Sequence, residues 1–261
     1  MTDPVYLTNT YDRRFEATVT RVLGDRVTLD RTLFYPQGGG QPADRGTITN
    51  GQREWRVNNV GKTDTIYHHL TPIGEDSGEE ERKGIEGTEA SGREESSGSM
   101  PESGATVRGE IGWERRYGHM CHHTAQHLLS ALLLEEYDAA TTGNQLYADR
   151  ARIDVGYGRF EDEDLEAIET RMNDLVSEAR PVESYELGRE TAEAELDPER
   201  TRIELLPDSI TEIRIVEIEG YDRTACAGTH VRNTEEISTV TVTGRESRGS
   251  GEERLRFTLE S

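Results

Sequence analysis

Apolar and polar residues alternate in short runs along the first part of the chain. A period of two is typical of β-strands that bury one face and expose the other. Asn50 and Gly51 separate two of the runs, and this dipeptide is a strong signal for a two-residue hairpin. We therefore predict a small, mostly antiparallel and barrel-like β domain over residues 1–112. The predicted strands cover residues 16–24, 26–30, 45–49, 53–60, 65–70 and 105–112.

After Trp113 the spacing of apolar residues changes to the 3.6-residue period of a helix, and Leu128, Leu129, Leu132 and Leu133 share one helix face. Helices and strands then mix without a regular βαβ repeat. This pattern predicts an α+β domain over residues 113–261, with a sheet covered by helices on one face. A second helix is predicted over residues 161–179, and strands over 146–156, 181–188, 212–220, 237–244 and 253–260.

Residues 74–104 interrupt the β domain with a different composition. The segment is rich in Gly, Ser and Glu, carries ten acidic against three basic residues, and has almost no large apolar side chains. Such a segment cannot bury enough surface to offset the entropy of ordering it. We predict a disordered loop or linker inserted into the β domain, and we expect that residues 75–103 can be deleted without loss of folding.

The chain is strongly acidic, with a formal net charge of -22 and lysine only at Lys62 and Lys83. A protein adapted to a very salty cytoplasm would have this composition. The alternative is an acidic protein without such adaptation. Nucleic-acid binders usually carry a basic surface. Molar salt screens the attraction to phosphates, however, so the acidity weakens the case for a nucleic-acid partner without excluding it.

The remaining composition narrows the class of protein further. The N-terminus lacks the features of a signal peptide, and no apolar run approaches the roughly 18 residues of a membrane span. Two cysteines cannot build a disulfide framework. The stretch PQGGGQP lacks the G-K-S/T ending of a phosphate loop, so ATP is not expected. We predict a cytoplasmic protein with no membrane partner.

Histidines are concentrated at the start of the first predicted helix, in GHMCHHTAQHLL. His119, His123 and His127 recur every four residues and project from nearly the same side. The first turn is either merely polar, or two of its imidazoles hold one metal ion. About 100 residues later, CAGTHV repeats the spacing with Cys226 and His230. The two pairs together favour the metal site, and we predict one zinc ion per chain bound by His123, His127, Cys226 and His230.

HHTAQHLL and CAGTHV resemble the paired signatures of the alanyl-tRNA editing family, which comprises the editing domain of alanyl-tRNA synthetase and the freestanding AlaX proteins. A third stretch, TLFYPQGGGQPADRGTI at residues 32–48, is similar to the glycine-rich segment of the AlaX N-terminal β domain. The resemblance covers most of the chain apart from the acidic insertion. One departure is Ala227, where family members often carry Gly. The chain has no aminoacylation motif and begins with its own Met, so it looks freestanding.

The resemblance implies a trans-editing hydrolase that deacylates alanine tRNA carrying a wrong amino acid. The substrate would be chiefly seryl-tRNA(Ala), with glycyl-tRNA(Ala) as a further candidate. It also implies that zinc participates in ester hydrolysis by a metal-associated water. The substrate-binding residues that it suggests are Thr32, as the contact for the seryl hydroxyl, and a pocket wall made by Gly38, Gly39, Gly40 and Gln41.

Four further polar residues have two interpretations each or lie outside the predicted site. Gln126, between the two helical ligands, either faces the substrate or solvates the helix. His119 either replaces a ligand or lies beside the metal shell, and Asp222 either orients a ligating histidine or is an ordinary turn residue. Cys121 lies on a different helix face from His123 and is left out of the site.

Two other functions stay open from the residues. One is a zinc-stabilised module that binds tRNA or aminoacyl groups without catalysis. The other is a hydrolase of a different substrate, such as a free aminoacyl ester or D-aminoacyl-tRNA. The chain has no G-x-S-x-G motif to support an acyl-enzyme, and no Glu between the helical histidines as in H-E-x-x-H zinc proteases.

Overall fold

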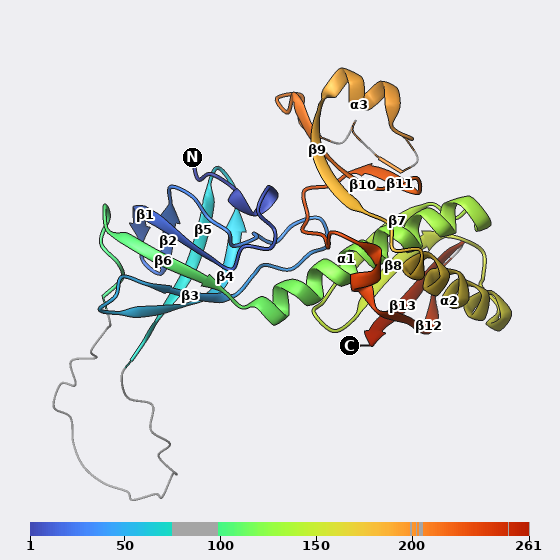
Figure 1. Cartoon of the computed structure of the whole chain (residues 1–261), viewed down its shortest axis with the longest axis horizontal. Coiled ribbons are helices and arrows are strands. Elements are labelled where there is room, and N and C mark those ends of the chain that lie inside the picture. Colours follow the sequence, from blue (N-terminus) through green and yellow to red (C-terminus); the bar gives the residue numbers. More distant parts are fainter. Residues whose placement is uncertain (75–98, 199, 202, 204–205, 250, 261) are drawn as a thin grey trace, which may run out of the picture.

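The computed structural model describes residues 1–74, 99–198, 200–201, 203, 206–249 and 251–260. Figure 1 shows two units joined by helix α1 (Trp113–Tyr137), which begins beside the N-terminal barrel and runs into the second unit. The predicted α+β class with an N-terminal barrel is confirmed. Among the described residues, no helix is long and apolar enough to cross a membrane.

The N-terminal unit is a closed barrel of six antiparallel strands. Their bounds are Arg14–Leu23 (β1), Arg26–Leu29 (β2), Gly46–Thr49 (β3), Glu54–Lys62 (β4), Ile66–Ile73 (β5) and Thr106–Ile111 (β6), and a short 3-10 helix, η1, precedes them at Val5–Leu7. The hydrogen-bonded order is β1, β2, β5, β4, β3, β6.

The alternation in the sequence corresponds to the inner and outer faces of this barrel. Along β4, Trp55, Val57 and Val60 are buried, and the step of three between the last two follows from a shift in the β4–β5 register. Such a bulge adds one residue and restores the inward direction of the next side chain. The predicted Asn50-Gly51 hairpin joins β3 to β4, with Gly51 at a φ of 86° that favours glycine.

The second unit contains two sheets, so the prediction of a single sheet was wrong. One has the order β11, β10, β9 and the other the order β12, β13, β8, β7. The segment 146–156, predicted as one strand, contains the tight turn of a hairpin, in which Leu146 pairs with Ala151 and only residues 151–156 form the second strand. The elements are β7 (Thr141–Leu146), β8 (Ala151–Gly156), α2 (Asp162–Ser177), β9 (Val182–Gly188), α3 (Arg189–Glu195), β10 (Glu212–Ile218), β11 (Asp222–Ala225), η3 (Thr234–Ile237), β12 (Thr239–Gly249) and β13 (Glu252–Glu260).

Helix α1 is the central element of the second unit. Every residue from His119 to Leu133 is buried, so this part of the helix is surrounded on all sides. Its leucines join a core formed with α2 and the four-stranded sheet. Polar side chains on the same stretch must therefore find partners inside the protein.

A buried ion pair holds α1 against the barrel. Arg116 and Asp44 are at most 1% exposed, and Arg116 Nε lies 3.0 Å from Asp44 Oδ2. The guanidinium also donates to the carbonyl oxygens of Leu33, at 2.6 Å, and Thr10, at 3.2 Å. Each charged group is thus compensated by hydrogen bonds, which burial of an ion pair requires.

The predicted acidic insertion falls mainly on residues outside the described part of the chain, but its predicted end at residue 104 is wrong. The described residues before β6 pack on the barrel: Met100 contacts its core and Pro101 is buried. Trp55 Nε1 donates to the carbonyl oxygen of Ser99, and Gly104 N donates to that of Val19. An apolar pair at the end of a polar segment therefore marks the return of the chain to the barrel.

We expect the acidic segment to be removable, provided that the packed residues stay. Ile73 pairs with Glu54, and Ser99 contacts Trp55, so both ends of the segment lie at the same end of β4. A short Gly-Ser linker in place of residues 75–98 should leave the free energy of unfolding in high salt unchanged.

The matched variant extends this deletion through residue 103. It should lower the free energy of unfolding by about 1–3 kcal/mol, because one or two apolar side chains lose their burial. Chemical denaturation measures both effects. Equal stability of the two deletion variants would contradict the new boundary.

Candidate metal centre

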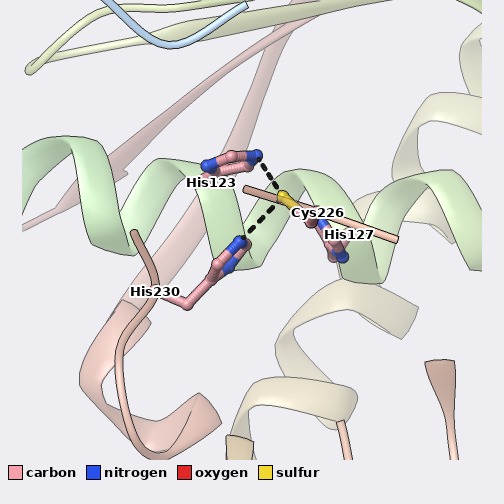
Figure 2. Close-up of side chains that lie close together, drawn as sticks. All are labelled: His123, His127, Cys226 and His230. Carbon is pink, nitrogen blue, oxygen red and sulfur yellow. Dashed lines mark hydrogen bonds between the residues drawn. The ribbon is translucent and has the colours of Figure 1, made fainter. Parts of the chain in front are cut away.

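The four side chains predicted to bind zinc converge at one point in the second unit (Figure 2). His123 and His127 come from α1, whereas Cys226 and His230 come from the turn that follows β11. The atoms that can bind an ion all lie within 4.8 Å of one another. Cys226 Sγ is 3.6 Å from His123 Nε2 and 3.3 Å from His230 Nε2. The structure therefore contains a group that can hold a metal ion.

Each imidazole of this cluster is oriented by a hydrogen bond at Nδ1. His123 Nδ1 donates to Gln41 Oε1 at 3.0 Å, and His127 Nδ1 donates to Asp222 Oδ2 at 3.2 Å. His230 Nδ1 lies 3.2 Å from the hydroxyl of Thr124. That hydroxyl already donates to a backbone carbonyl at 3.0 Å, so it accepts from His230. All three rings keep Nε2 free to face the cluster, as in metal sites where outer partners fix the tautomer.

Asp222 is itself fixed by an arginine. Arg200 donates to Asp222 Oδ1 from Nε at 3.0 Å and from Nη2 at 2.7 Å, which leaves Oδ2 for His127. Arg200 Nη1 also donates to the hydroxyl of Ser130 on α1. Of the two interpretations of Asp222, the structure therefore supports the one in which it orients a histidine.

The electrostatics of the cluster suit a thiolate among imidazoles. Burial alone would raise the pKa of Cys226, but the neighbouring His123 and His230 lower it well below its usual value. Burial also lowers the pKa of His230 to about 3, so this ring is neutral. For His127, burial is outweighed by the hydrogen bonds to Asp222 and Cys226, which raise its pKa to about 9.

One thiolate and three imidazoles, all neutral once an ion replaces the proton of His127, form a donor set that zinc accepts in proteins. The hydrogen bonds at Nδ1 supply the outer contacts that such sites require, and Gly228 N donates to Cys226 Sγ at 3.3 Å. The donors thus fit a soft or borderline divalent ion, whereas Mg²⁺ and Ca²⁺ prefer oxygen ligands.

The turn that carries Cys226 depends on a glycine that sequence reasoning did not single out. A Cβ on Gly228 would lie 2.0 Å from His123 Cε1 and 2.4 Å from its Nδ1, so the ring packs directly on the backbone. Ala227, the departure from the family pattern, is exposed and has room for its methyl group. The turn therefore tolerates alanine at residue 227 and requires glycine at residue 228.

A cavity of about 500 Å³ opens onto the cluster. His123, His127 and Cys226 line it, whereas His230 does not. Its volume lies within the range of small-molecule sites. The remaining lining residues, grouped by origin, are Tyr6, Tyr35, Pro36, Gln37, Gly38, Gly39 and Lys62 of the barrel, Gln126, Ser130, Thr141, Thr142, Gly143 and Asn144 of α1 and β7, and Arg200, Thr224, Ala225, Ala227 and Gly228.

One part of the glycine-rich segment lines the cavity, and the other part bonds to the residues behind it. Gly38 and Gly39 line the cavity, but Gly40 and Gln41 do not. The carbonyl oxygen of Gly40 accepts from Leu146 N at 2.9 Å, which docks the segment on β7. Gln41 is fully buried, and its Oε1 accepts from His123 and from Thr229 N. Gln41 thus orients a predicted metal ligand from the barrel side.

Thr32 does not line this cavity, and its predicted contact with the substrate stays a prediction. Its side chain is fully buried in the barrel, where its hydroxyl lies 2.8 Å from His68 Nε2 and accepts from Phe34 N at 3.0 Å. His68 Nδ1 lies 3.1 Å from the carbonyl oxygen of Val27 and must donate to it, so Nε2 accepts from Thr32. The hydroxyl therefore already donates and accepts within the barrel.

The other polar residues of α1 have different surroundings. Gln126 lines the cavity, and its buried Oε1 has no hydrogen-bond partner among the described residues. Both ring nitrogens of His119 are likewise without a partner there, and burial, assisted by Arg115, lowers its pKa to about 3. Cys121 donates to the carbonyl oxygen of Glu236 at 3.4 Å and lies outside the metal group.

Comparisons with known proteins show the family of the chain. The family model of tRNA synthetases class II (A) matches residues 4–85, and that of the threonyl and alanyl tRNA synthetase second additional domain matches residues 213–256. The chain is 37% identical to the alanyl-tRNA editing protein AlaX-M of Methanosarcina barkeri, over 99% of both chains. It is 36% identical to AlaX-M of Methanosarcina acetivorans over the same shares. It is also 34% identical to the alanine–tRNA ligase of Pyrococcus abyssi, over 98% of this chain and 26% of the ligase. The chain therefore belongs to the AlaX family of alanyl-tRNA editing proteins.

Proposed function

We propose that this protein is a trans-editing hydrolase that deacylates alanine tRNA carrying a wrong amino acid, chiefly serine. The observation that carries the proposal is the position of the metal-binding group at the wall of the cavity. Three of its four members face the cavity, so an ion held there would be reachable by a substrate. The names of the relatives, alanyl-tRNA editing proteins, support the choice of tRNA(Ala) as partner.

The chemistry of the substrate matches the groups available. An aminoacyl-tRNA ester is already activated, so it needs an oriented water and stabilisation of the charge that develops on the carbonyl oxygen. Zinc, when bound by the four residues, would supply a Lewis acid for one of these tasks. Gln126, on the same wall, offers an amide that can position the water or the substrate amino group. No ATP is required by this chemistry.

Selection of serine over alanine needs a polar group that pairs with the seryl hydroxyl. Ser130 and Thr141 both line the cavity, and their hydroxyl oxygens lie 2.5 Å apart. Ser130 accepts from Arg200, and either hydroxyl can donate in the Ser130–Thr141 bond. When Ser130 is the donor, the hydroxyl hydrogen of Thr141 is available to the substrate. We therefore assign recognition of the hydroxyl to Thr141 in place of Thr32.

A zinc-stabilised binding module without catalysis is the second candidate. Four protein ligands can close a tetrahedral shell, as in structural zinc sites. The same lining residues would then hold the aminoacyl end without cleaving it. Zinc content combined with deacylation of seryl-tRNA(Ala) separates the two functions, because the module would bind zinc and tRNA and leave the ester intact.

The proposal also covers the cellular location of the protein and the role of its acidic surface. A net charge of -22 fits a protein that meets tRNA in a cytoplasm of high salt, where screening reduces repulsion between the protein and the phosphates. Activity measured at several salt concentrations tests this part of the proposal.

The first prediction concerns metal content. The purified protein should contain about one zinc ion per chain, as one four-ligand group implies. His123→Ala with Cys226→Ala should abolish it, whereas the matched control His69→Ala, on the barrel surface, should retain it. Atomic emission spectrometry measures the content. Full zinc occupancy in the double variant would rule out the assigned ligands.

The second prediction concerns pH. In the metal-free protein the pKa of His127 is raised to about 9, so at pH 7 the ring carries an extra proton that zinc must displace. Zinc affinity should therefore rise by about one decade per pH unit between pH 7 and pH 9 and level off above, where His127 is already neutral.

Competition with a zinc chelator across this range measures the slope. Asp222→Asn removes the carboxylate that raises the pKa of His127, so the levelling should move to lower pH. An affinity that is independent of pH in the unsubstituted protein would contradict the assignment.

The third prediction separates Thr141 from Thr32. Thr141→Val keeps the shape and removes one hydrogen bond to the seryl hydroxyl, so hydrolysis of seryl-tRNA(Ala) should slow by about tenfold, while the background on alanyl-tRNA(Ala) should hold. Thr32→Val instead leaves His68 without its donor, so both activities should fall together with stability. A selective loss of serine activity in Thr32→Val alone would return recognition to Thr32.

A further inference from the structure

The walls of the cavity beside the metal centre differ in charge from the rest of the molecule. Asp and Glu make up 52 of the 261 residues, yet none of the 21 described residues that line this cavity is acidic. Three other cavities, of about 330 to 520 Å³, each have Asp or Glu in their walls, with Glu135, Glu16 and Glu102 as examples. Apart from the metal ligands, the charged lining residues of the cavity are Lys62 and Arg200, and both are cations. This wall therefore suits an anionic ligand.

Lys62 is the cation that is free to bind such a ligand. Arg200 is already paired with Asp222, which neutralises its charge. Lys62 is exposed, and among the described residues its side chain has no ion pair or hydrogen bond. It is the last residue of β4, and its cross-strand partner Ile66 is buried in the barrel core. Directly paired residues share one face of a sheet, so Lys62 lies on the inner face at the end of the barrel that borders the cavity.

The barrel also contributes an uncharged donor to the same cavity. Tyr6, in η1, is 3% exposed and lines the cavity. Its ring meets that of Tyr35 edge to face at 5.3 Å, and Tyr35 donates its own hydroxyl hydrogen to the carbonyl oxygen of Gly38 at 3.0 Å. The Tyr6 hydroxyl has no such partner among the described residues. Burial raises the pKa of Tyr6 to about 12, so this hydroxyl keeps its hydrogen at neutral pH.

The Tyr6 hydroxyl is open to the cavity. The buried side-chain atoms that lack a partner and are closed off from solvent belong to His119, His122 and Gln126, and Tyr6 is not among them. The small accessible part of Tyr6 therefore includes its hydroxyl oxygen, and the space that this side chain lines is the cavity. An unpaired hydroxyl in a buried side chain lowers stability, and a ligand that accepts its hydrogen would offset this cost.

We propose that the barrel wall of this cavity binds the terminal nucleotide of the tRNA, with Lys62 paired to its 5′-phosphate and the Tyr6 hydroxyl donating to its nucleoside. This assignment rests on the proposed function, which brings the aminoacyl ester to the metal-binding group in the wall of the same cavity. The cavity volume of about 500 Å³ suits a ligand of nucleotide size. In an aminoacyl-tRNA, the anion nearest to the ester is the 5′-phosphate of the nucleotide that carries it.

The two contacts define which substrates the cavity favours. A free aminoacyl ester has no phosphate, so Lys62 adds nothing to its binding, whereas every aminoacyl-tRNA carries the phosphate and the nucleoside. Lys62 and Tyr6 therefore distinguish a tRNA end from a smaller ester. They do not contribute to the choice between serine and alanine, because the terminal nucleotide is the same for both.

Binding of 5′-AMP and of adenosine to the zinc-loaded protein tests the phosphate contact without hydrolysis. NMR titration measures both dissociation constants. The unsubstituted protein should bind 5′-AMP about threefold to fivefold more tightly than adenosine, the gain expected from one exposed ion pair. Lys62→Gln should abolish this preference and leave the affinity for adenosine unchanged. Arg56→Gln removes an exposed cation from the same strand, outside the cavity, and this matched control should retain the preference.

Tyr6→Phe tests the nucleoside contact. This variant should bind 5′-AMP and adenosine alike about fivefold more weakly, because both compounds carry the nucleoside. Its free energy of unfolding should not fall, because the lost hydroxyl has no partner among the described residues. Unchanged affinities, or a loss of stability that shows a hydrogen bond within the protein, would overturn this contact.

A preference for 5′-AMP that persists in Lys62→Gln would put the phosphate elsewhere, such as on the metal ion, and would overturn the phosphate contact. Equal binding of the two compounds by the unsubstituted protein, or binding of neither, would overturn it as well. A protein that shows the Lys62-dependent preference but leaves seryl-tRNA(Ala) intact would instead refute the proposed function. The two failures therefore give different results.

Discussion

Three hydrogen bonds at the Nδ1 atoms of His123, His127 and His230 set the geometry on which the metal centre depends. Their partners come from different parts of the chain: Gln41 from the barrel, Asp222 from β11 and Thr124 from α1 itself. If any of these elements were displaced, one imidazole would be free to rotate away from the thiolate. All four ligands lie in the second unit, but one of their orienting partners, Gln41, belongs to the barrel, so the geometry of the centre depends on the packing between the two units.

The contact that holds α1 against the barrel is polar although it is deeply buried. Arg116 and Asp44 give up their hydration, and the cost is offset because the guanidinium also donates to two backbone carbonyl oxygens. Such a network is satisfied in one arrangement only, whereas an apolar contact tolerates sliding. The pair therefore fixes the position of α1 relative to the glycine-rich segment, and so the width of the cavity between Gly39 and His123.

Sequence patterns predicted the parts of this molecule whose signal is local. Alternation identified the barrel, and spacing of four brought the Cys226 pair together with the helical histidines. The two sheets of the second unit could not be separated, because the pairing of β9 with β10 or of β8 with β13 is set by contacts distant in sequence. The protein partners of Thr32 and Gln41 could not be predicted, because a hydroxyl or an amide carries no pattern that shows which neighbour it bonds. Met100 and Pro101 were assigned to the insertion because their apolar character is diluted by polar neighbours.

Gly228 shapes the metal centre although it supplies no ligand atom. The His123 ring occupies the space in which a side chain at this position would stand, because the methyl carbon of an alanine there would lie 2.0 Å from the ring. Any substitution there would displace the ring and leave the surrounding core intact. In a mutational survey scored on activity, residue 228 would consequently be as intolerant as the four ligands. A map of tolerance along CAGTH would thus contain an essential position that does not bind the ion.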